Sequence, residues 1–257
     1  MGRLSRTVAV AANTFRETVR ERVLYNLVFF ALLMTLSGLL LGRLSIRQDE
    51  RIIKDLGLAA MEVFGTVIAI FIGVGLVSKE IERRSLFPLL AKPLTRGEFL
   101  VGKALGLAWT LGVNVVVMAV GLYLTLWLTG RSLDLTLLKA VYGIYLGLLL
   151  VLALALLFST VTSSAMASVC TVAMVVAGRF SDVVRNMNQI GAGAPAALTE
   201  TLYWLLPNFR NLDFKTAVVH GLPVPFDVLG LVTLYVAVYG GVVISIALAV
   251  FRKRDFQ

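Results

Sequence analysis

The sequence predicts an all-α membrane protein with six transmembrane helices. Of its 257 residues, 58% are hydrophobic and only 15% are charged, and the mean hydropathy is +0.88. Soluble domains carry roughly 25% charged residues. Six apolar runs are long enough to cross a bilayer, because about 20 helical residues span about 30 Å of hydrocarbon. These runs cover approximately residues 23–41, 58–77, 104–128, 138–158, 165–177 with its flanks, and 228–251.

The distribution of prolines and basic residues supports this topology. All six prolines lie outside the apolar runs, so the predicted spans are unbroken. With the N-terminus inside, the cytoplasmic segments hold more Lys and Arg than the outward ones, as the positive-inside rule requires. We therefore expect residues 1–257 to form a single transmembrane domain with both termini in the cytoplasm.

The segment before the first span, residues 1–22, has the periodicity of an amphipathic helix. Such a helix lies in the headgroup plane with its apolar face in the lipid. A solvated lead-in to the first span is the alternative. The apolar stripe consists of Val8, Ala11, Ala12, Phe15 and Val19.

Residues 78–103 form the longest cytoplasmic connection. Residues 79–84 are charged and favour a helix that continues the second span past the membrane. Apolar side chains, among them Leu86 and Phe87, then follow close to water. The segment is interpreted as a docking surface for a cytosolic partner, and the alternative is that it dips back into the lipid interface.

The stretch RGEFLVGKAL, residues 96–105, nearly matches a phosphate-binding loop. A capping box of Thr95 and Glu98 instead predicts a helix that begins near Arg96, and a helix does not cradle phosphates as a loop does. The Ser or Thr that binds magnesium after the lysine is also missing. We expect no nucleotide site here, and we expect Gly102 and Gly106 to allow close helix packing.

Residues 178–227 face outward and are too apolar for a plain loop. Pro195 suits the first turn of a short helix that stops at Pro207, so one or two short helices are expected to pack on the outer ends of the spans. Glu62 lies about one turn inside the outer end of the second span. It is either an intramembrane functional group or a side chain that reaches the interface.

Several classes of function are excluded by composition. One cysteine, Cys170, and one histidine, His220, cannot build a disulfide framework, a Cys/His zinc site or a Cys–His nucleophile pair. The net charge of +9 lies beside apolar runs, where anionic lipid headgroups explain it better than nucleic acid does. We expect neither enzymatic activity nor a metal, cofactor or nucleic-acid site in this chain.

Three regions of the sequence resemble the ABC-2 type transporter permeases, in particular those encoded beside copper-enzyme maturation systems. The first is KEIERRS with LLAKPLTRGEFLVGK in the cytoplasmic connection. The other two are RETVRER near the N-terminus and LLPNF before the last span. The resemblance implies a six-span permease of the bacterial or archaeal cytoplasmic membrane. It also implies a second permease, identical or paralogous, and two cytosolic ATPase subunits that bind ATP and Mg²⁺.

The resemblance also implies roles for particular segments. The N-terminal helix would be the interfacial connecting helix, and the loop between spans two and three would hold a coupling helix in a cleft of the ATPase. The coupling surface would consist of Glu80, Glu82, Arg83, Arg84, Ser85, Leu86 and Phe87.

Two functions are compatible with the sequence. In the first, ATP hydrolysis by the partner drives export of an apolar or amphipathic molecule. In the second, the chain is a mechanotransmitter or scaffold that passes ATPase work to a periplasmic partner protein, and nothing crosses the bilayer. A small outward cap would favour export, whereas a large exposed apolar surface in residues 178–227 would favour the second function.

Overall fold

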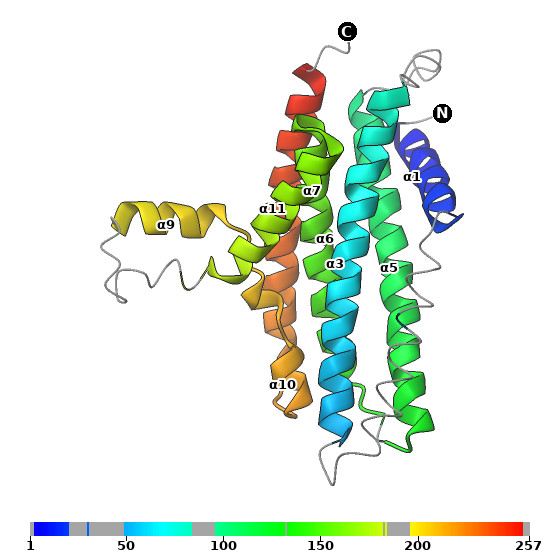
Figure 1. The fold of residues 1–257 in the computed structure, drawn as a ribbon, viewed down its shortest axis with the longest axis vertical. Coiled ribbons are helices and arrows are strands. Elements are labelled where there is room, and N and C mark those ends of the chain that lie inside the picture. Colours follow the sequence, from blue (N-terminus) through cyan, green and yellow to red (C-terminus); the bar gives the residue numbers. More distant parts are fainter. Residues whose placement is uncertain are drawn as a thin grey trace.

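The computed structural model describes most of the chain, and the regular elements of that part are all helices (Figure 1). The predicted all-α fold class is confirmed for this part. The described residues are 3–20, 30, 49–83, 96–131, 133–181, 183 and 196–253. The helices are α1 (Arg3–Arg20), α3 (Asp49–Arg83), α5 (Arg96–Leu128), α6 (Leu137–Val161), α7 (Ser164–Arg179), α9 (Ala196–Leu205), the 3-10 helix η1 (Arg210–Leu212), α10 (Lys215–Val219) and α11 (Phe226–Lys253).

Four of the described helices, α3, α5, α6 and α11, are long and apolar enough to cross a membrane. They correspond to the second, third, fourth and sixth predicted spans. The fifth predicted span is α7, which is shorter at 16 residues. The first, residues 23–41, lies outside the described residues apart from Phe30, which is buried. The count of six spans therefore stays a prediction.

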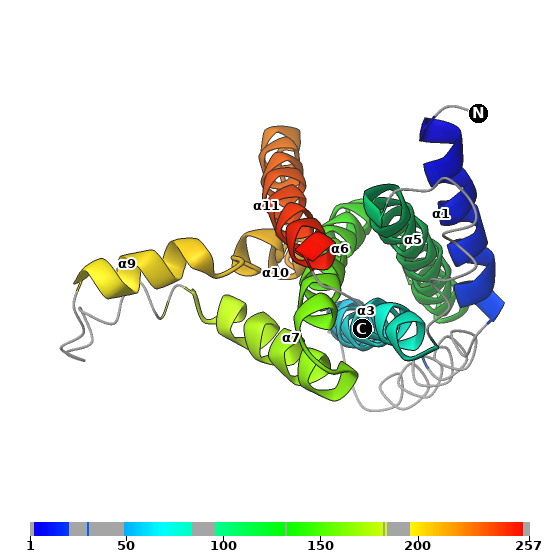
Figure 2. The ribbon, with the colours of Figure 1, turned by 90° about the horizontal axis from the view of Figure 1, so that it is seen from above.

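The bundle is built around α6. Its apolar window is 67% buried, compared with 28% for the window of α11, because α3, α5, α7 and α11 all pack against α6 (Figure 2). Leu, Val and Ala side chains from these helices form one hydrophobic core. This arrangement explains why α6 is apolar on every side whereas a peripheral helix needs one buried face.

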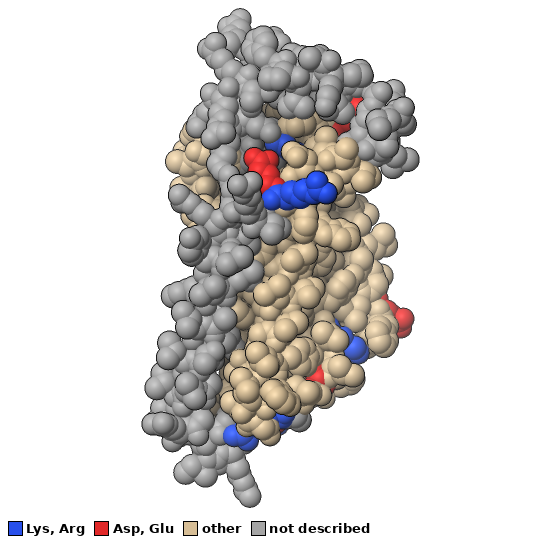
Figure 3. All heavy atoms as spheres, turned by 90° about the vertical axis from the view of Figure 1, so that its right-hand side faces the viewer, with Lys and Arg blue, Asp and Glu red and all other residues tan. Residues whose placement is uncertain are grey.

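The two ends of the bundle carry different elements. At one end, here called the α1 end, lie α1, the beginning of α5 and the C-terminal end of α11, with α1 beside α5 (Figure 1). At the other, here called the α10 end, lie α10, the beginning of α3 and the turn between α5 and α6. Charged side chains occupy both ends of the face in Figure 3, with an uncharged band between them, as expected for a protein that crosses a bilayer.

Helix α5 begins at Arg96, as predicted, so the stretch that nearly matches a phosphate-binding loop is helical. α1 lies across this first part of α5 (Figures 1 and 2). A Cβ at Gly102 would lie 2.8 Å from the Cβ of Val10, and one at Gly106 would lie 2.6 Å from the carbonyl oxygen of Ala11. The prediction that the two glycines allow close helix packing is confirmed.

The apolar stripe predicted for α1 is only partly covered by α5. Val8 is 61% exposed and Ala12 is exposed, whereas Thr14 and Thr18 are buried. Ala11 and Phe15 are partly buried, and the backbone of Ala11 contacts Gly106. α1 therefore contacts α5 through Val10, Ala11 and Thr14, and it leaves Val8 and Ala12 uncovered by the described residues.

The predicted short helix after Pro195 is confirmed as α9, which ends before Pro207. It projects sideways from the bundle (Figures 1 and 2). The Tyr239 hydroxyl donates to the carbonyl oxygen of Leu205 at 2.8 Å, and the backbone N–H of Asn208 donates to the Tyr235 hydroxyl at 2.9 Å. The C-terminal end of α9 is thereby tied to α11.

Candidate functional site

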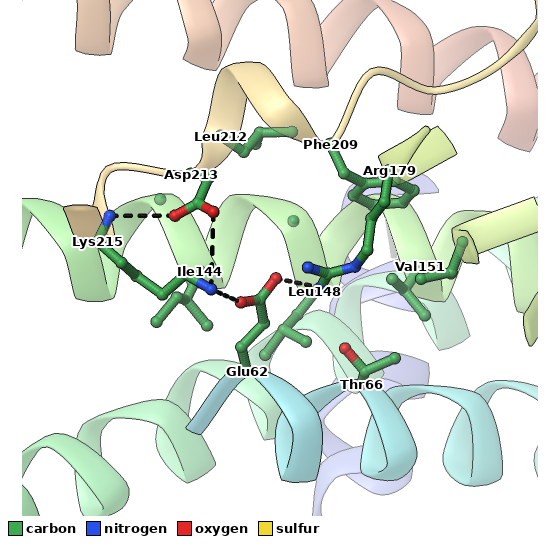
Figure 4. A pocket seen from close by; sticks show the side chains of 13 residues that line it. Glu62, Thr66, Ile144, Leu148, Val151, Arg179, Phe209, Leu212, Asp213 and Lys215 are labelled. Carbon is green, nitrogen blue, oxygen red and sulfur yellow. Dashed lines mark hydrogen bonds and ion pairs between the residues drawn. The ribbon is translucent and has the colours of Figure 1, made fainter. Parts of the chain in front are cut away.

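Glu62 of α3 lies at the centre of a group of charged side chains near the α10 end (Figure 4). Its Oε1 accepts a hydrogen bond from Arg179 at the end of α7, and its Oε2 accepts one from Lys215 at the start of α10. Asp213 lies beside them, with its Oδ2 3.7 Å from Lys215 Nζ. We call these four residues the Glu62 cluster. It joins three elements that are far apart in the sequence.

Arg179 is positioned by the residue before it. Gly178 contacts the carbonyl oxygen of Pro207 and the Phe209 ring so closely that a side chain at this position would collide with the backbone. The end of α7 is therefore held against the segment that leads into η1. Arg179 occupies the last turn of α7, where the helix dipole favours a cation.

Lys215 is positioned by its own turn and by α6. The backbone N–H of Lys215 donates to Asp213 Oδ1 at 3.1 Å, a side-chain turn that begins α10. A Cβ at Gly143 of α6 would lie 2.6 Å from both the Leu212 carbonyl oxygen and the Phe214 ring. Because Gly143 has no side chain, η1 and α10 pack directly on α6 and bring Lys215 over Glu62.

The surroundings of the cluster are polar on one side and apolar on the other. The side chains of Glu62 and Lys215 are 19% and 15% exposed, and that of Arg179 is 41% exposed. Next to the charges, towards the α1 end, lies a small hollow between α3, α6 and α7, here called the hollow (Figure 4). Its apolar side is lined by Leu148, Val151, Val175 and Phe209, with Thr66.

The helix that carries Glu62 begins earlier than the apolar run predicts. The sequence places Glu62 about one turn inside the outer end of the second span, within reach of the interface. Helix α3 begins at Asp49, so further helical residues precede Glu62 on the side of the α10 end, and its depth in the membrane stays a prediction. Its carboxylate is bound by two cations, which the sequence did not assign to it. A carboxylate within a predicted membrane span requires a cationic partner. This requirement is the sequence signal that Lys or Arg side chains lie near Glu62, but it does not say which ones.

The predicted coupling residues are not tested by the structure. Helix α3 does continue to Arg83, which confirms the helix predicted beyond the second span. Glu80, Glu82 and Arg83 belong to its last turns, where the side chains are not described. Arg84, Ser85, Leu86 and Phe87 lie outside the described residues. Their role stays a prediction.

A second charged group lies at the extreme of the α10 end. Lys54, which is buried, contacts Glu50 at 2.6 Å and Asp134 at 3.8 Å. The backbone N–H of Thr136 donates to Asp134 Oδ1 at 2.9 Å, and this bond lowers the pKa of the Asp134 carboxyl below its usual value. The pairs connect α3 to the turn between α5 and α6. Within the described residues, no three His, Cys, Asp or Glu side chains gather as metal ligands would.

Residues 8–208 match the ABC-2 family transporter proteins. The chain belongs to the ABC-2 transporter family. It is therefore a multi-pass membrane protein and the membrane component of an ABC transporter, and the family implies an ABC ATPase as its partner. The resemblance to ABC-2 permeases is confirmed, whereas the link to copper-enzyme maturation stays a prediction. No curated protein matches the sequence.

Proposed function

We propose that the chain is the transmembrane subunit of an ATP-driven exporter of apolar or amphipathic molecules. Its match to the ABC-2 transporter family carries this proposal. Two cytosolic ATPase subunits bind ATP and Mg²⁺ and perform the hydrolysis, and this chain contributes no catalytic group. It works as a dimer with a second copy or a close paralogue, in a bacterial or archaeal cytoplasmic membrane with both termini inside.

The contact between α1 and α5 supports a route for the mechanical step. α5 begins at Arg96, nine residues after the end of the proposed coupling surface, residues 80–87, and α1 packs on the first turns of α5 through Gly102 and Gly106. Close packing of backbone on backbone resists sliding. A displacement of the coupling surface by the ATPase therefore moves α1 and α5 together, with the exposed Val8 and Ala12 of α1 in the lipid interface.

The Glu62 cluster supports a closed outward end. With the termini inside, the α10 end faces outward, and the cluster fastens α10 and the end of α7 to α3. A molecule that leaves between these helices requires the ion pairs to separate. Breaking and remaking them during each cycle is the proposed role of Glu62.

The coupling surface is tested by co-purification of the ATPase with the permease in detergent. Phe87→Ala combined with Leu86→Ala removes the apolar anchors, and the loss should be about 2 kcal/mol or more, because contact energy concentrates in such anchors. Arg84→Ala should cost about 1 kcal/mol or less. Phe71→Ala, which truncates an exposed phenylalanine within the α3 span, is the matched control. Full retention of the ATPase by the double variant, with undiminished stimulated hydrolysis, would remove the coupling assignment.

One observation favours the alternative function, a mechanotransmitter that drives a periplasmic partner. α9 projects from the bundle, and Trp204 on it is 74% exposed. In contrast, η1 and α10 form a packed cap, in which Leu212 and Val218 are buried. Trp204→Ala separates the two functions. Under the export proposal, transport by the reconstituted complex continues, and under the alternative the variant loses a periplasmic protein that co-purifies with the wild type.

A further inference from the structure

The segment that leads into η1 is attached to the middle of a candidate span and not to its outward end. The carbonyl oxygen of Leu205 accepts a hydrogen bond from Tyr239, and the backbone N–H of Asn208 donates to the Tyr235 hydroxyl. Counted from the first residue of α11, Tyr235 and Tyr239 lie about 14 and 20 Å along the helix, at 1.5 Å per residue. The candidate span of α11 has 26 residues, so both tyrosines lie near its middle.

α7 ends at a similar level. Its 16 residues extend about 24 Å, which is less than the roughly 30 Å of bilayer hydrocarbon. Its last residue, Arg179, and the first residue of α10, Lys215, both bind Glu62 of α3. η1 and its flanking turns therefore lie beside the spans and not beyond their ends. At membrane depth, irregular backbone is tolerated only where protein or water covers it.

The side of η1 and α10 that faces away from the core is polar. Leu212 of η1 is buried in the core. The exposed side chains from the start of η1 through the first turn of α10 are all polar or charged: Arg210, Asn211, Asp213 and Thr216. Such groups are costly in hydrocarbon, because lipid tails offer them no hydrogen bonds. This side is therefore suited to water and not to lipid.

We propose that the exposed side of η1 and α10 lines a water-filled cleft, which reaches from the outward surface to the level of Glu62. Arg210, Asn211 and Thr216 belong to one wall. The second permease copy supplies the opposite wall and keeps lipid away. The inference rests on the proposed export function, from which it takes the orientation and the dimer, and it assigns the outward part of the export route to this side of the bundle.

The test is the reactivity of single cysteines in intact cells that express the permease with its ATPase, in a Cys170→Ser background. The probe is a permanently charged methanethiosulfonate, which does not cross the membrane. It reacts with the ionised thiol, a form that apolar surroundings suppress. Asn211→Cys reports on the cleft, and His220→Cys, exposed at the end of α10, is the reference for outward water.

Leu234→Cys is the matched control on the apolar side of α11. Leu234 is 61% exposed and precedes Tyr235, which binds the backbone of Asn208. It also follows Thr233, whose hydroxyl is 2.9 Å from that of Tyr142 in the first turns of α6. Leu234 therefore lies at about the depth of η1, but its apolar surroundings predict contact with lipid.

We expect Asn211→Cys to react within about tenfold of the rate of His220→Cys, and Leu234→Cys at least about a hundredfold more slowly, because apolar surroundings raise a thiol pKa by several units. Thr216→Cys, exposed on α10, repeats the measurement and guards against misfolding of the first variant. Reaction at positions 211 and 216 as slow as at 234 would show a dry surface, packed on lipid or on the second copy. Reaction at 234 as fast as at 211 would place this level outside the bilayer. Either result overturns the proposal.

These outcomes are distinguishable from failure of the export function itself. Cysteine labelling reads water and not transport, whereas the coupling test reads ATPase retention alone. If position 211 is unreactive and the ATPase still depends on Phe87, only the cleft is wrong. If position 211 reacts as expected and no ATPase associates, the cleft stands and the export function falls.

Discussion

The contact between α1 and α5 and the Glu62 cluster both join separate helices, but by different forces. At the α1 end, Gly102 and Gly106 let the backbones approach so closely that a methyl group would collide. At the α10 end, one carboxylate binds two cations from α7 and α10. Close packing depends on shape and is insensitive to salt, whereas ion pairs separate and re-form as the local charge changes. The difference indicates a rigid joint at one end and a reversible one at the other.

The largest loss of stability is expected from Gly106→Leu. The nearest obstacle is the backbone oxygen of Ala11, which cannot rotate away as a side chain would. We expect a destabilisation of about 3 kcal/mol, measured by thermal unfolding in detergent, with α1 displaced from α5. Gly241→Leu is the matched control, because nothing lies within 4 Å of its Cβ position. Similar behaviour of the two variants would mean that α1 is not fixed on α5.

A somewhat smaller loss of stability is expected from Glu62→Gln. The change leaves Arg179 and Lys215 without their shared carboxylate, and uncompensated charges in a partly buried site are costly. We expect a loss of about 2 kcal/mol, of which the added change Lys215→Met restores a part. Glu200→Gln, on the exposed face of α9, should change stability by less than about 0.5 kcal/mol. No recovery in the double variant would show that Glu62 acts through other groups.

Ionic strength should affect the Glu62 cluster and the contact between α1 and α5 differently. Raising the ionic strength from about 0.1 to 1 M shortens the screening length from about 10 to 3 Å. The destabilisation by Glu62→Gln should therefore shrink by about half, because Arg179 is partly exposed, whereas that by Gly106→Leu should not change. The check is thermal unfolding of both variants at the two salt concentrations. An equal response to salt would contradict the distinction between shape and charge.

The smallest effect concerns Asp134, in the turn between α5 and α6. Its pKa in the folded protein is lowered chiefly by the Thr136 N–H, so its contribution to stability is complete above about pH 4, its ordinary unfolded pKa, and is lost as the pH falls through the lower folded value. Asp134→Asn should cost about 0.5 kcal/mol near neutral pH and less in acid. Unfolding measured between pH 3 and 7 tests this, and a cost that grows in acid would contradict the assignment.

Local patterns predicted the elements well but not the pairings across the bundle. The capping box near Arg96 and the proline before α9 act within one helical turn, so the sequence alone located both helix starts. The partners of Glu62 are 117 and 153 residues away in the chain, and no periodicity encodes such a contact. The extension of α3 back to Asp49 was also missed, because a search for apolar runs stops at charged residues that continue the helix.

The central claim is that the joint at the α10 end, formed by the Glu62 cluster, opens while the contact of α1 with α5 stays fixed. Distances between spin labels test it in the complex with the ATPase, in a Cys170→Ser background diluted with unlabelled permease. One pair of labels replaces Val63 and Thr216, on α3 and α10, and the other replaces Ala12 and Trp109, on α1 and α5; all four positions are exposed. On addition of ATP and vanadate, the first distance should change by about 5 Å, on the scale of one helical turn, and the second by less than about 1 Å. The account would be contradicted if the distance between α3 and α10 stayed fixed while the distance between α1 and α5 changed.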